Sequence, residues 1–533
     1  MILRSRVVLF GLFLLLVLFL SFVPQLRERF QDVLPPPETP VGTPNNDLYA
    51  EKSDYAPSGV SQTGECIEQA EWLTELADSP DIKFPIKYAR RDIIVREQPG
   101  LERSSLLKLD EKLFPAFQKI VSPEKSDLDP KSCLPPLHLD VPPFERELDA
   151  SHVLFGAATT VQRAEASIPF LMRWLSSTGA RLILDVKGND DKPANTKDMA
   201  SLERRMRELG LAVTLISAVE KKGDNVQRYF SLVKTLYKYK DEKTKWVGFI
   251  DDDTFFTSMS GLLSRLHTFE HQKEQYLGAV SEEWWTVCQY GWIAMGGGGI
   301  FLSIPLLELL DRNYADCKKK ATRTFGDHRI AECIERHTDT RLTHLDGLHQ
   351  IDLHGDRSGV FESGRQTLSL HHWKEGYWSE DGSGPDAIRH PRWFPLDTMS
   401  LVSNVCGDTC FLQRWQFGKD TLLTNGYSIA MYPKGHLKSL ELFKMEKTWV
   451  TPINVEDSLN NGYDHYLGPL RPALKLEKEK IHYRFMDAKL TKEGGVRQYF
   501  RHLGKDGEIN ELIELHWTKE DAQTSANVSI PQN

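Results

Sequence analysis

The chain has 533 residues, of which 40% are hydrophobic and 26% charged, and its formal net charge is −9 at pH 7. This composition excludes a wholly disordered chain, and the length gives room for two or three domains with a sizeable core. The negative balance, without a Lys/Arg stripe interleaved with aromatic residues, argues against a nucleic-acid partner.

The amino-terminal residues predict a membrane anchor. The basic MILRSR is followed by VVLFGLFLLLVLFLSFV, an apolar stretch without charge. This stretch is slightly shorter than a typical span of about 20 residues but within the usual range, so we expect a cytosolic tail and transmembrane signal-anchor in residues 1–26. A cleaved signal peptide is the alternative, although no convincing pair of small residues precedes a cut. Arg4 and Arg6 predict a single-pass type II orientation with the body on the luminal side.

Two regions of different composition follow the apolar stretch. Residues 27–63 contain LPPPETPVGTPNND and few apolar residues, which is typical of a flexible stem. Residues 64–148 regain apolar content and are expected to form an accessory amino-terminal region. Within it, CIEQAEWLTELA has helical spacing, SSLLKLDEKLFPAFQKIV favours a second helix, and CLPPLHLDVPPFERE predicts a linker.

Strand and helix patterns alternate in the next region, residues 149–395. The predicted strands are SHVLFGAATT, ARLILDVKG, LAVTLISAV and KWVGFIDDD, and amphipathic helical segments separate them. Such alternation predicts an α/β fold in which a mostly parallel, Rossmann-like sheet carries helices on both faces. In sheets of this kind, ligands bind beyond the carboxyl ends of the strands.

The last part of the chain has a β-rich pattern. Runs such as TLLTNGYSIAMYP, KIHYRFMDAKL and NELIELHW are rich in aromatic and β-branched residues and are separated by turn residues. They predict a separate, sandwich-like β domain in residues 396–522. Residues 523–533 are expected to form a polar tail, where the sequon at Asn527 fits a glycoprotein of the secretory route.

The seven cysteines suit an oxidising lumen, and they include no CxxC pair for zinc or redox chemistry. Cys406 and Cys410 can close a small loop, and Cys317 and Cys333 flank a helix-loop segment. Because seven is odd, at least one cysteine is free or paired between chains. A homo-oligomer, disulfide-linked or non-covalent, therefore remains an open alternative.

Three consecutive carboxylates, Asp251, Asp252 and Asp253, end the last of the predicted strands. Alternation along a strand places Asp251 and Asp253 on one side, where they would make a hard oxygen site for Mn²⁺ or Mg²⁺. A solvated acidic turn or a helix N-cap is the structural alternative. The strand ahead of the triplet and the motifs downstream favour the metal site.

Three further motifs follow in order. Gly296, Gly297, Gly298 and Gly299 lie between apolar segments, and four glycines allow a backbone to approach a ligand closely, although a flexible loop is the alternative. Asp327 begins an amphipathic helix, where an N-cap role is the alternative. His371 and His372 follow a short apolar run, and an isolated histidine is more often structural than a ligand.

The ordered set FIDDDTFF, AMGGGGIFLS, FGDHRIAECI and LSLHHW resembles the Fringe-type branch of the family 31 glycosyltransferases, over roughly residues 150–375. The resemblance implies a GT-A nucleotide-sugar-binding catalytic domain, a type II Golgi membrane protein, a Mn²⁺ or Mg²⁺ cofactor and a UDP-sugar donor. The accessory region and the β-rich domain have no counterpart in the small animal Fringe enzymes.

The resemblance also implies roles for individual residues. It makes Asp253 the direct metal ligand, with Asp251 and Asp252 nearer the ribose or the metal, and His371 the late metal-binding histidine, with adjacent His372 as the alternative. It makes Asp327 the catalytic base, although Gly326 stands where the family has a second acidic residue. The glycines would wall the sugar and acceptor site, here Gly-Gly-Gly-Gly rather than the usual Gly-Gly-Ala-Gly. Asp185 and, more weakly, Arg163 would line the nucleotide pocket.

These features together predict an inverting, metal-dependent glycosyltransferase. It would move a hexose or N-acetylhexosamine from a UDP-sugar to a hydroxyl of a glycan or glycoprotein acceptor, with β1,3-type linkage. The first alternative is a carbohydrate-binding or scaffold protein on an inactive transferase fold. The second is a metal-dependent phosphoesterase, which would need further His/Asp clusters for a second ion, and the sequence has no convincing set.

Overall fold

The computed structural model describes residues 82–122, 134–144, 147–188, 194–218, 225–322, 324–373, 395–450, 467–503 and 509–520. All of these residues belong to one compact unit, Thr63–Asn533. The expected anchor and stem, the helix expected at 66–77 and the tail with its sequon lie outside the described residues. Among the described residues, no helix combines the length and the apolar character that a membrane crossing needs.

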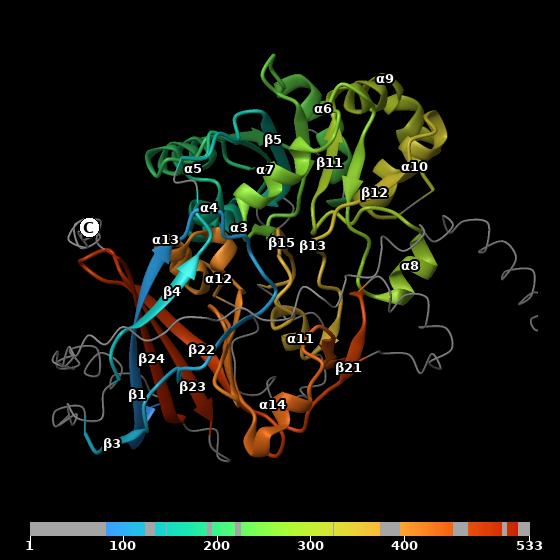
Figure 1. Ribbon diagram of the computed structural model, residues 1–533. Helices are drawn as coiled ribbons and strands as arrows, with labels where there is room; N and C mark the ends of the chain where they lie inside the picture. Colours follow the sequence, from blue (N-terminus) through green and yellow to red (C-terminus); the bar gives the residue numbers. More distant parts are fainter. Residues whose placement is uncertain are drawn as a thin grey trace, which may run out of the picture. The chain divides into compact units, whose positions relative to one another are not determined.

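A seven-stranded sheet forms the centre of the predicted α/β region (Figure 1). Its order is β12-β10-β11-β8-β5-β6-β7, and β5, β6, β7 and β8 pair in parallel, which confirms the four predicted strands. β11 pairs antiparallel with both β8 and β10. The bounds are β5 Val153–Thr160, β6 Arg181–Lys187, β7 Val213–Ser217, β8 Trp246–Phe249, β10 Tyr276–Gly278, β11 Ile300–Ser303 and β12 Leu342–His344.

Helices cover both faces of this sheet, as the alternating pattern predicts. Adjacent residues of β5 point to opposite faces, so that Phe155 packs in one apolar cluster and Leu154 in another. The Phe155 cluster takes in residues of α4, α5 and α7, and the Leu154 cluster takes in residues of α6, α9 and α10. The bounds are α3 Val161–Ala166, α4 Ile168–Trp174, α5 Thr196–Glu208, α6 Asn225–Tyr239, α7 Met259–His267, α9 Ile304–Lys320 and α10 Gly326–His337.

A second sheet has ten strands and draws on both ends of the described chain. Its order is β2-β16-β17-β18-β22-β23-β24-β1-β3, with β4 paired to β1. The long strands β1 and β24 run parallel to each other. The bounds are β1 Ile82–Glu97, β2 Leu107–Leu109, β3 Gln118–Ile120, β4 Leu137–Val141, β16 Arg414–Phe417, β17 Thr421–Thr424, β18 Ser428–Met431, β22 Ile481–Leu490, β23 Val496–Leu503 and β24 Ile509–Lys519.

This sheet corrects two expectations. The helix expected in residues 104–121 is wrong, because the segment holds the strands β2 and β3, and Pro115 between them cannot lie inside a helix. The accessory region and the β-rich region, expected as separate, supply strands to one sheet rather than to a sandwich. Backbone groups of a buried strand need partners on both sides, and β1 finds them in β24, β3 and β4.

Short elements connect the two sheets. Ser258 and Ser260 at the start of α7 donate hydrogen bonds to the Asp408 carboxylate, at 2.9 and 2.7 Å. The disulfides Cys317–Cys333 and Cys406–Cys410 are both formed, and Cys288 is exposed and free. The remaining α-helices and strands are α8 Trp284–Tyr290, α11 Ser358–Phe361, α12 Leu396–Met399, α13 Ser403–Cys406, α14 His436–Ser439, β9 Phe255–Phe256, β13 Leu348–His349, β14 His354–Gly355, β15 Ser369–Leu370, β19 Met445–Lys447, β20 Trp449–Val450 and β21 Leu470–Pro472.

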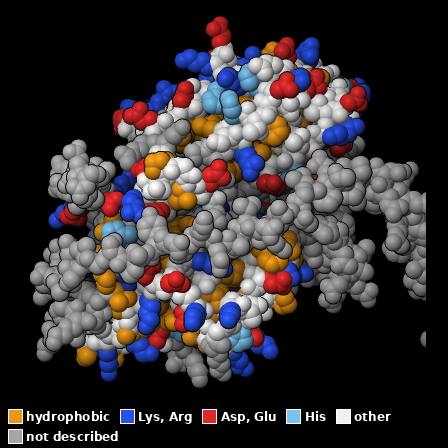
Figure 2. All heavy atoms as spheres, viewed as in Figure 1, with side chains coloured by type: hydrophobic (Ala, Val, Ile, Leu, Met, Phe, Trp, Pro, Cys, Tyr) orange, Lys and Arg blue, Asp and Glu red, His pale blue; other side chains and the backbone are white. Residues whose placement is uncertain are grey.

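Charges of both signs are interspersed on the surface. On the face shown in Figure 2, acidic and basic side chains lie side by side rather than gathering by sign. The charged side chains of this face therefore form no single-sign field that would attract a polyanion.

Candidate functional site

The acidic triplet lies in the turn that follows β8, at the carboxyl end of the parallel strands. The Asp251 amide donates a hydrogen bond to Thr254 Oγ1 at 3.0 Å, and that hydroxyl donates to the Gly297 carbonyl at 2.9 Å. Thr254 thus ties the acidic turn to the tetraglycine segment, which leads into β11. The two motifs are 43 residues apart in the sequence and adjacent in space.

His371 joins the triplet from β15, which pairs antiparallel with β9. Its Nε2 lies 2.9 Å from an Asp253 oxygen and 3.4 Å from an Asp251 oxygen. Its Nδ1 lies 3.3 Å from the Gln350 carbonyl, an acceptor that needs a proton on Nδ1. Nδ1 donates to this carbonyl, so Nε2 is the nitrogen directed at the carboxylates, and loss of its proton would supply the lone pair that a metal-binding histidine requires.

The electrostatics of this pair differ from those of ordinary surface groups. Burial alone would lower the pKa of His371, but the Asp253 carboxylate, in direct contact, raises that pKa to about 9. Burial alone would raise the pKa of Asp253, but His371 holds it well below its usual range. The side chains of His371 and Asp253 are 5% and 9% exposed, so the pair stands where water screens charge weakly.

The donor set fits a divalent cation. Asp253, His371 and His372 each offer a ligand atom, and these atoms lie within 4.8 Å of one another. Carboxylate oxygens suit Mn²⁺ and Mg²⁺, and imidazole nitrogens suit first-row transition-metal ions, so the mixed set is compatible with a divalent transition-metal ion. Asp251 adds a further carboxylate beside His371, and its side chain is 37% exposed, so it faces the open side of the cluster.

His372 has a second partner that distinguishes it from His371. Its Nε2 lies 3.3 Å from an Asp352 oxygen, and Asp352 also accepts a hydrogen bond from Ser281 Oγ at 2.5 Å. The backbone of His372 has a positive φ of 50°, which a non-glycine residue adopts at some cost. The structure therefore places His371 against the acidic triplet and ties His372 to a neighbouring carboxylate.

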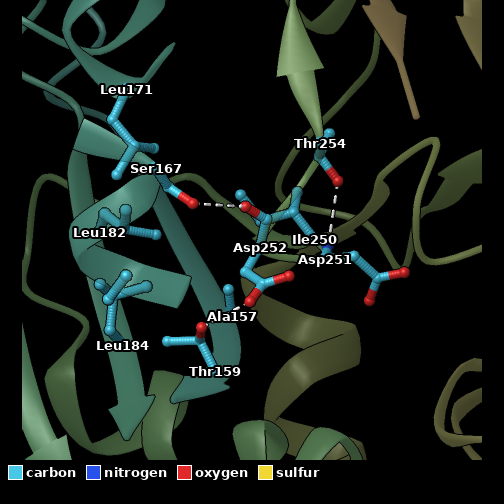
Figure 3. A pocket seen from close by; sticks show the side chains of 11 residues that line it. Ala157, Thr159, Ser167, Leu171, Leu182, Leu184, Ile250, Asp251, Asp252 and Thr254 are labelled. Carbon is cyan, nitrogen blue, oxygen red and sulfur yellow. Dashed lines mark hydrogen bonds between the residues drawn. The ribbon is translucent and has the colours of Figure 1, made fainter. Parts of the chain in front are cut away.

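Asp252 and Arg163 form an ion pair with each other. Arg163 Nε and Nη2 both reach the Asp252 carboxylate at 2.6 Å, and Thr159 Oγ1 donates to it at 2.5 Å. Figure 3 shows Asp252 pointing toward Thr159 at one wall of a small pocket, with Ser167 Oγ bonded to the Asp252 carbonyl at 3.1 Å. This pair anchors α3 to the acidic turn, on the side away from His371.

Asp185 lies inside the fold. It stands near the carboxyl end of β6, is fully buried, and pairs with Arg228 of α6 at 3.1 Å. Arg228 also donates to the Thr159 carbonyl at 2.8 Å. The structure thus assigns Asp185 a structural contact between β5, β6 and α6, and does not bring it to the acidic triplet.

The tetraglycine segment packs against the metal-ligand candidates. A Cβ atom on Gly297 would lie 2.1 Å from His371 Nδ1, so only glycine fits beside that ring. Gly298 donates from its amide to Gln350 Oε1 at 3.0 Å and accepts from Ser369 Oγ at 2.6 Å. The glycines are therefore a close-packed wall rather than a flexible lid.

Asp327 lies beside the first of these glycines, in the first turn of α10, and, together with burial, its charge helps to raise the pKa of Asp251. Its carboxylate accepts a hydrogen bond from the Gly296 amide at 3.1 Å, and its side chain is 14% exposed. Tyr229 of α6 lies beneath both segments: Cβ atoms on Gly296 and Gly326 would each come within 2.5 Å of it. The ring of Tyr229 thus explains why glycine precedes Asp327 in this chain.

Several residues of the site were not singled out from the sequence. Thr254, Tyr229, Gln350 and Asp352 position the acidic triplet, the glycines and the histidines through the contacts given above. The stretch LHQIDLHGD, which mixes polar and apolar residues without a period, was the one available signal for Gln350 and Asp352. Tyr229 sits in an ordinary amphipathic helix and gave none.

The chain is similar to known proteins over part of its length. A family model described as a protein of unknown function, DUF604, matches residues 287–377, which include the glycines, Asp327 and both histidines. No curated protein matches the chain. Several solved structures match part of it, as follows.

The glycosyltransferase GlyE of Streptococcus pneumoniae TIGR4 is 15% identical, with 37% of this chain and 45% of GlyE covered and a TM-score of 0.26. An active-site mutant of LgtC is 11% identical, with 44% of this chain and 93% of LgtC covered and a TM-score of 0.31. The mannosyltransferase PcManGT of Pyrobaculum calidifontis, solved with GDP-Man and Mn²⁺, is 14% identical. The match covers 42% of this chain and 64% of PcManGT, with a TM-score of 0.25. The chain spans less than half of GlyE, and all three TM-scores are below 0.5, so any function has to be inferred from the site itself.

Proposed function

We propose that this protein is an inverting, metal-dependent glycosyltransferase that uses a UDP-sugar donor and a glycan acceptor, with β1,3-type linkage. The observation that carries the proposal is the joint placement of two groups at the carboxyl end of β8. The Asp253–His371 pair offers a cation site there, and Asp327 lies beside Gly296, near enough to Asp251 for its charge to act on that carboxylate. The motif resemblance to Fringe-type enzymes supports the choice of donor and linkage.

Asp253 and His371 would hold the cation, with Asp251 and His372 beside them. When bound, Mn²⁺ or Mg²⁺ would neutralise charge on the diphosphate of the donor. The Gln350 carbonyl keeps the His371 ring oriented, and Gly297 leaves room for that ring. Arg163 neutralises Asp252, so the repulsion among the three consecutive carboxylates is reduced.

Asp327 would accept the proton of the acceptor hydroxyl. The acceptor oxygen forms its bond to the anomeric carbon as the bond from that carbon to the diphosphate breaks, and a single displacement inverts the configuration. The Gly296 amide donates to one carboxylate oxygen of Asp327 and the His328 amide to the other, which fixes the side chain for this role.

We also propose that the protein works in the secretory pathway as a type II Golgi membrane protein. The apolar stretch after MILRSR supports an anchor, and the two disulfides formed among the described residues suit an oxidising lumen. Protease protection of sealed vesicles that contain the full chain tests this orientation, and a body digested from the cytosolic side contradicts it.

The test of the function is UDP release by the full chain with Mn²⁺, a panel of UDP-sugars and mixed glycan acceptors. We expect acceptor-dependent release that Asp253→Ala and Asp327→Asn each reduce by at least about 100-fold, since each removes a group that acts in the transition state. The matched control Arg205→Gln removes an exposed ion pair between Arg205 of α5 and Glu165 of α3 and should keep activity. Mn²⁺-dependent UDP binding without turnover would instead support a binding protein. The absence of both UDP binding and turnover would contradict the proposal.

A further inference from the structure

Three arginines converge at a place distant in sequence from the acidic triplet. Arg365 lies in the loop between α11 and β15, Arg414 begins β16, and Arg471 is in β21. Two glycines of positive φ make room for them: a Cβ on Gly364 would lie 2.2 Å from Arg414 Nε, and a Cβ on Gly468 would lie 2.1 Å from Arg365 Nη2. Besides burial, the charges of Arg471 and Arg365 both lower the pKa of Arg414, so the three arginines are also neighbours electrostatically.

Most donors of these guanidinium groups have no protein acceptor among the described residues. Arg471 donates from Nη2 to Glu446 at 2.7 Å, while its Nε and Nη1 are buried without a hydrogen-bond partner. Arg414 is 3% exposed and donates from Nε to the Ser105 carbonyl at 3.0 Å. The guanidinium groups of Arg414 and Arg471 make no other hydrogen bond to a described residue. The guanidinium group of Arg365 makes no hydrogen bond to a described residue.

Three acids lie near these arginines and Lys480: Asp346, whose charge acts on Arg365, together with Glu362 and Glu446. Glu446 accepts from Lys480 as well as from Arg471, and Glu362 accepts from Lys480 and from His482. Burial first, and then the neighbouring Arg471 and Arg365, lower the pKa of Arg414 to about 10. The group of three arginines therefore carries positive charge in excess of its acidic partners, in a poorly solvated place.

Such an arrangement is unfavourable unless an anion completes it. Buried N–H groups without acceptors and like charges in proximity both raise the free energy of the folded protein. Planar guanidinium forks match the oxygen atoms of phosphate, sulfate or carboxylate groups, to which they donate in pairs. By contrast, Arg103 nearby donates to three carbonyls, those of Thr409, Gly364 and Arg365, and is satisfied by the protein itself.

We propose that Arg365, Arg414 and Arg471 form an anion-binding site that takes a phosphate, sulfate or carboxylate group. Arg414 forms the buried floor, and Arg365 and Arg471, which are only partly buried, form the entrance. The loop that carries Arg365 continues into β15 and His371, so an anion held here also holds the segment that supplies a candidate metal ligand. The site is separate from the proposed donor site and needs neither cation nor nucleotide.

Calorimetry and thermal unfolding of the full chain test this site. The probes are sodium phosphate, sodium sulfate and sodium acetate, with sodium chloride at equal ionic strength as the reference. We expect at least one probe to bind and, at about ten times its Kd, to raise the unfolding midpoint by roughly 1–3 °C. The probe that binds distinguishes a tetrahedral oxyanion from a carboxylate. Absence of binding by all three probes at millimolar concentration overturns the proposal.

Arg365→Gln is the decisive variant, because its guanidinium makes no hydrogen bond to a described residue and its loss should not prevent folding. Without a probe anion, the unfolding midpoint of Arg365→Gln should equal or exceed that of the wild type, since repulsion among the arginines is relieved. Its apparent affinity for the anion should be at least tenfold lower, so that the anion raises its midpoint less. Arg205→Gln, an exposed arginine on α5, should keep the full rise. Asp253→Ala should keep it too, which separates this site from the proposed transferase site. An unchanged rise in Arg365→Gln overturns the proposal.

Discussion

Two regions of the molecule bury carboxylates in different ways. Beside the ten-stranded sheet, Glu362 is enclosed by Lys480 at 3.1 Å, His482 at 2.5 Å and Ser428 at 2.5 Å, so both its oxygens are paired. At the end of β8, Asp251 and Asp253 share one histidine. A completed network holds distant segments together, whereas an incomplete one marks a place where a ligand supplies the missing charge.

Removing Lys480 from the completed network around Glu362 should have the largest effect on stability. Lys480→Met leaves Glu362 and Glu446 with less compensation in a buried place, and we expect a loss of about 3–5 kcal/mol in the free energy of unfolding. Urea unfolding measures it. The control Lys444→Met removes an exposed i,i+3 pair with Glu441 and should change stability by less than about 0.5 kcal/mol. Equal effects of the two variants would mean that the buried network is not a stabilising feature.

Crowding the incomplete site should abolish its function with less effect on folding. Gly297→Ala places a methyl group 2.1 Å from the His371 ring, so the ring must move away from Asp253. We expect UDP release and Mn²⁺ affinity each to fall by about 100-fold or more. Gly298→Ala is the matched control, because its nearest neighbours are 3.5 Å away. Activity that survives Gly297→Ala would exclude His371 from the working site.

Acid should weaken the completed network in a defined direction. Burial alone would raise the pKa of Glu362, but Lys480 and His482 hold it well below its ordinary value of 4.5. Since the folded pKa is below the unfolded one, the stabilisation is full above about pH 4.5 and is lost as the pH falls through the folded value. We expect the free energy of unfolding to fall by up to about 1.4 kcal/mol per pH unit from this group.

The measurement is urea unfolding between pH 3 and pH 7. Glu362→Gln should lower stability overall but flatten the acid slope, because the titrating group is gone. The exposed Glu441→Gln should leave the slope unchanged. A slope that is the same in Glu362→Gln and in the wild type would show that other carboxylates cause the acid response.

The smallest effect concerns a single hydroxyl beneath the incomplete site. Tyr229 Oη is buried and has no hydrogen-bond partner among the described residues. Tyr229→Phe keeps the ring under Gly296 and Gly326 and removes the unsatisfied group, so we expect stability to rise by up to about 1 kcal/mol. Thermal unfolding measures this change, with Tyr314→Phe in α9 as a control. A loss of stability would show that the hydroxyl is satisfied in solution.

Local patterns in the sequence were sufficient for β5, β6, β7 and β8 of the seven-stranded sheet, but they did not predict β10, β11 and β12. The four predicted strands are continuous apolar runs, and the helices between them repeat with the helical period, so each of these elements could be predicted from its own residues. The acidic triplet was predicted at the end of a strand for the same reason. The spacing of cysteines suggested a small loop closed by Cys406 and Cys410, which the structure contains, whereas the pairing of Cys317 with Cys333 was left open by the sequence.

Other features depended on contacts between segments that no local pattern connects. The ten-stranded sheet pairs β1 with β24, which lies more than 400 residues later in the chain. The apolar pattern of a strand does not identify the strand with which it pairs. Residues 104–121 have apolar spacing compatible with a helix, yet pairing with β16 and β1 makes strands of them. Tertiary pairing overrides weak local preference in such short segments.

The sequence by itself determined the order of strands and helices in the central region and the chemistry available at the strand end, because periodicity and residue type are local properties. Only the tertiary structure decided how each charged group is used. It paired Asp252 with Arg163 and Asp185 with Arg228, and left Asp253 to His371. The energy of an ion pair depends on the distance between its charges in space. Residues far apart in the chain come close to each other only when the chain folds.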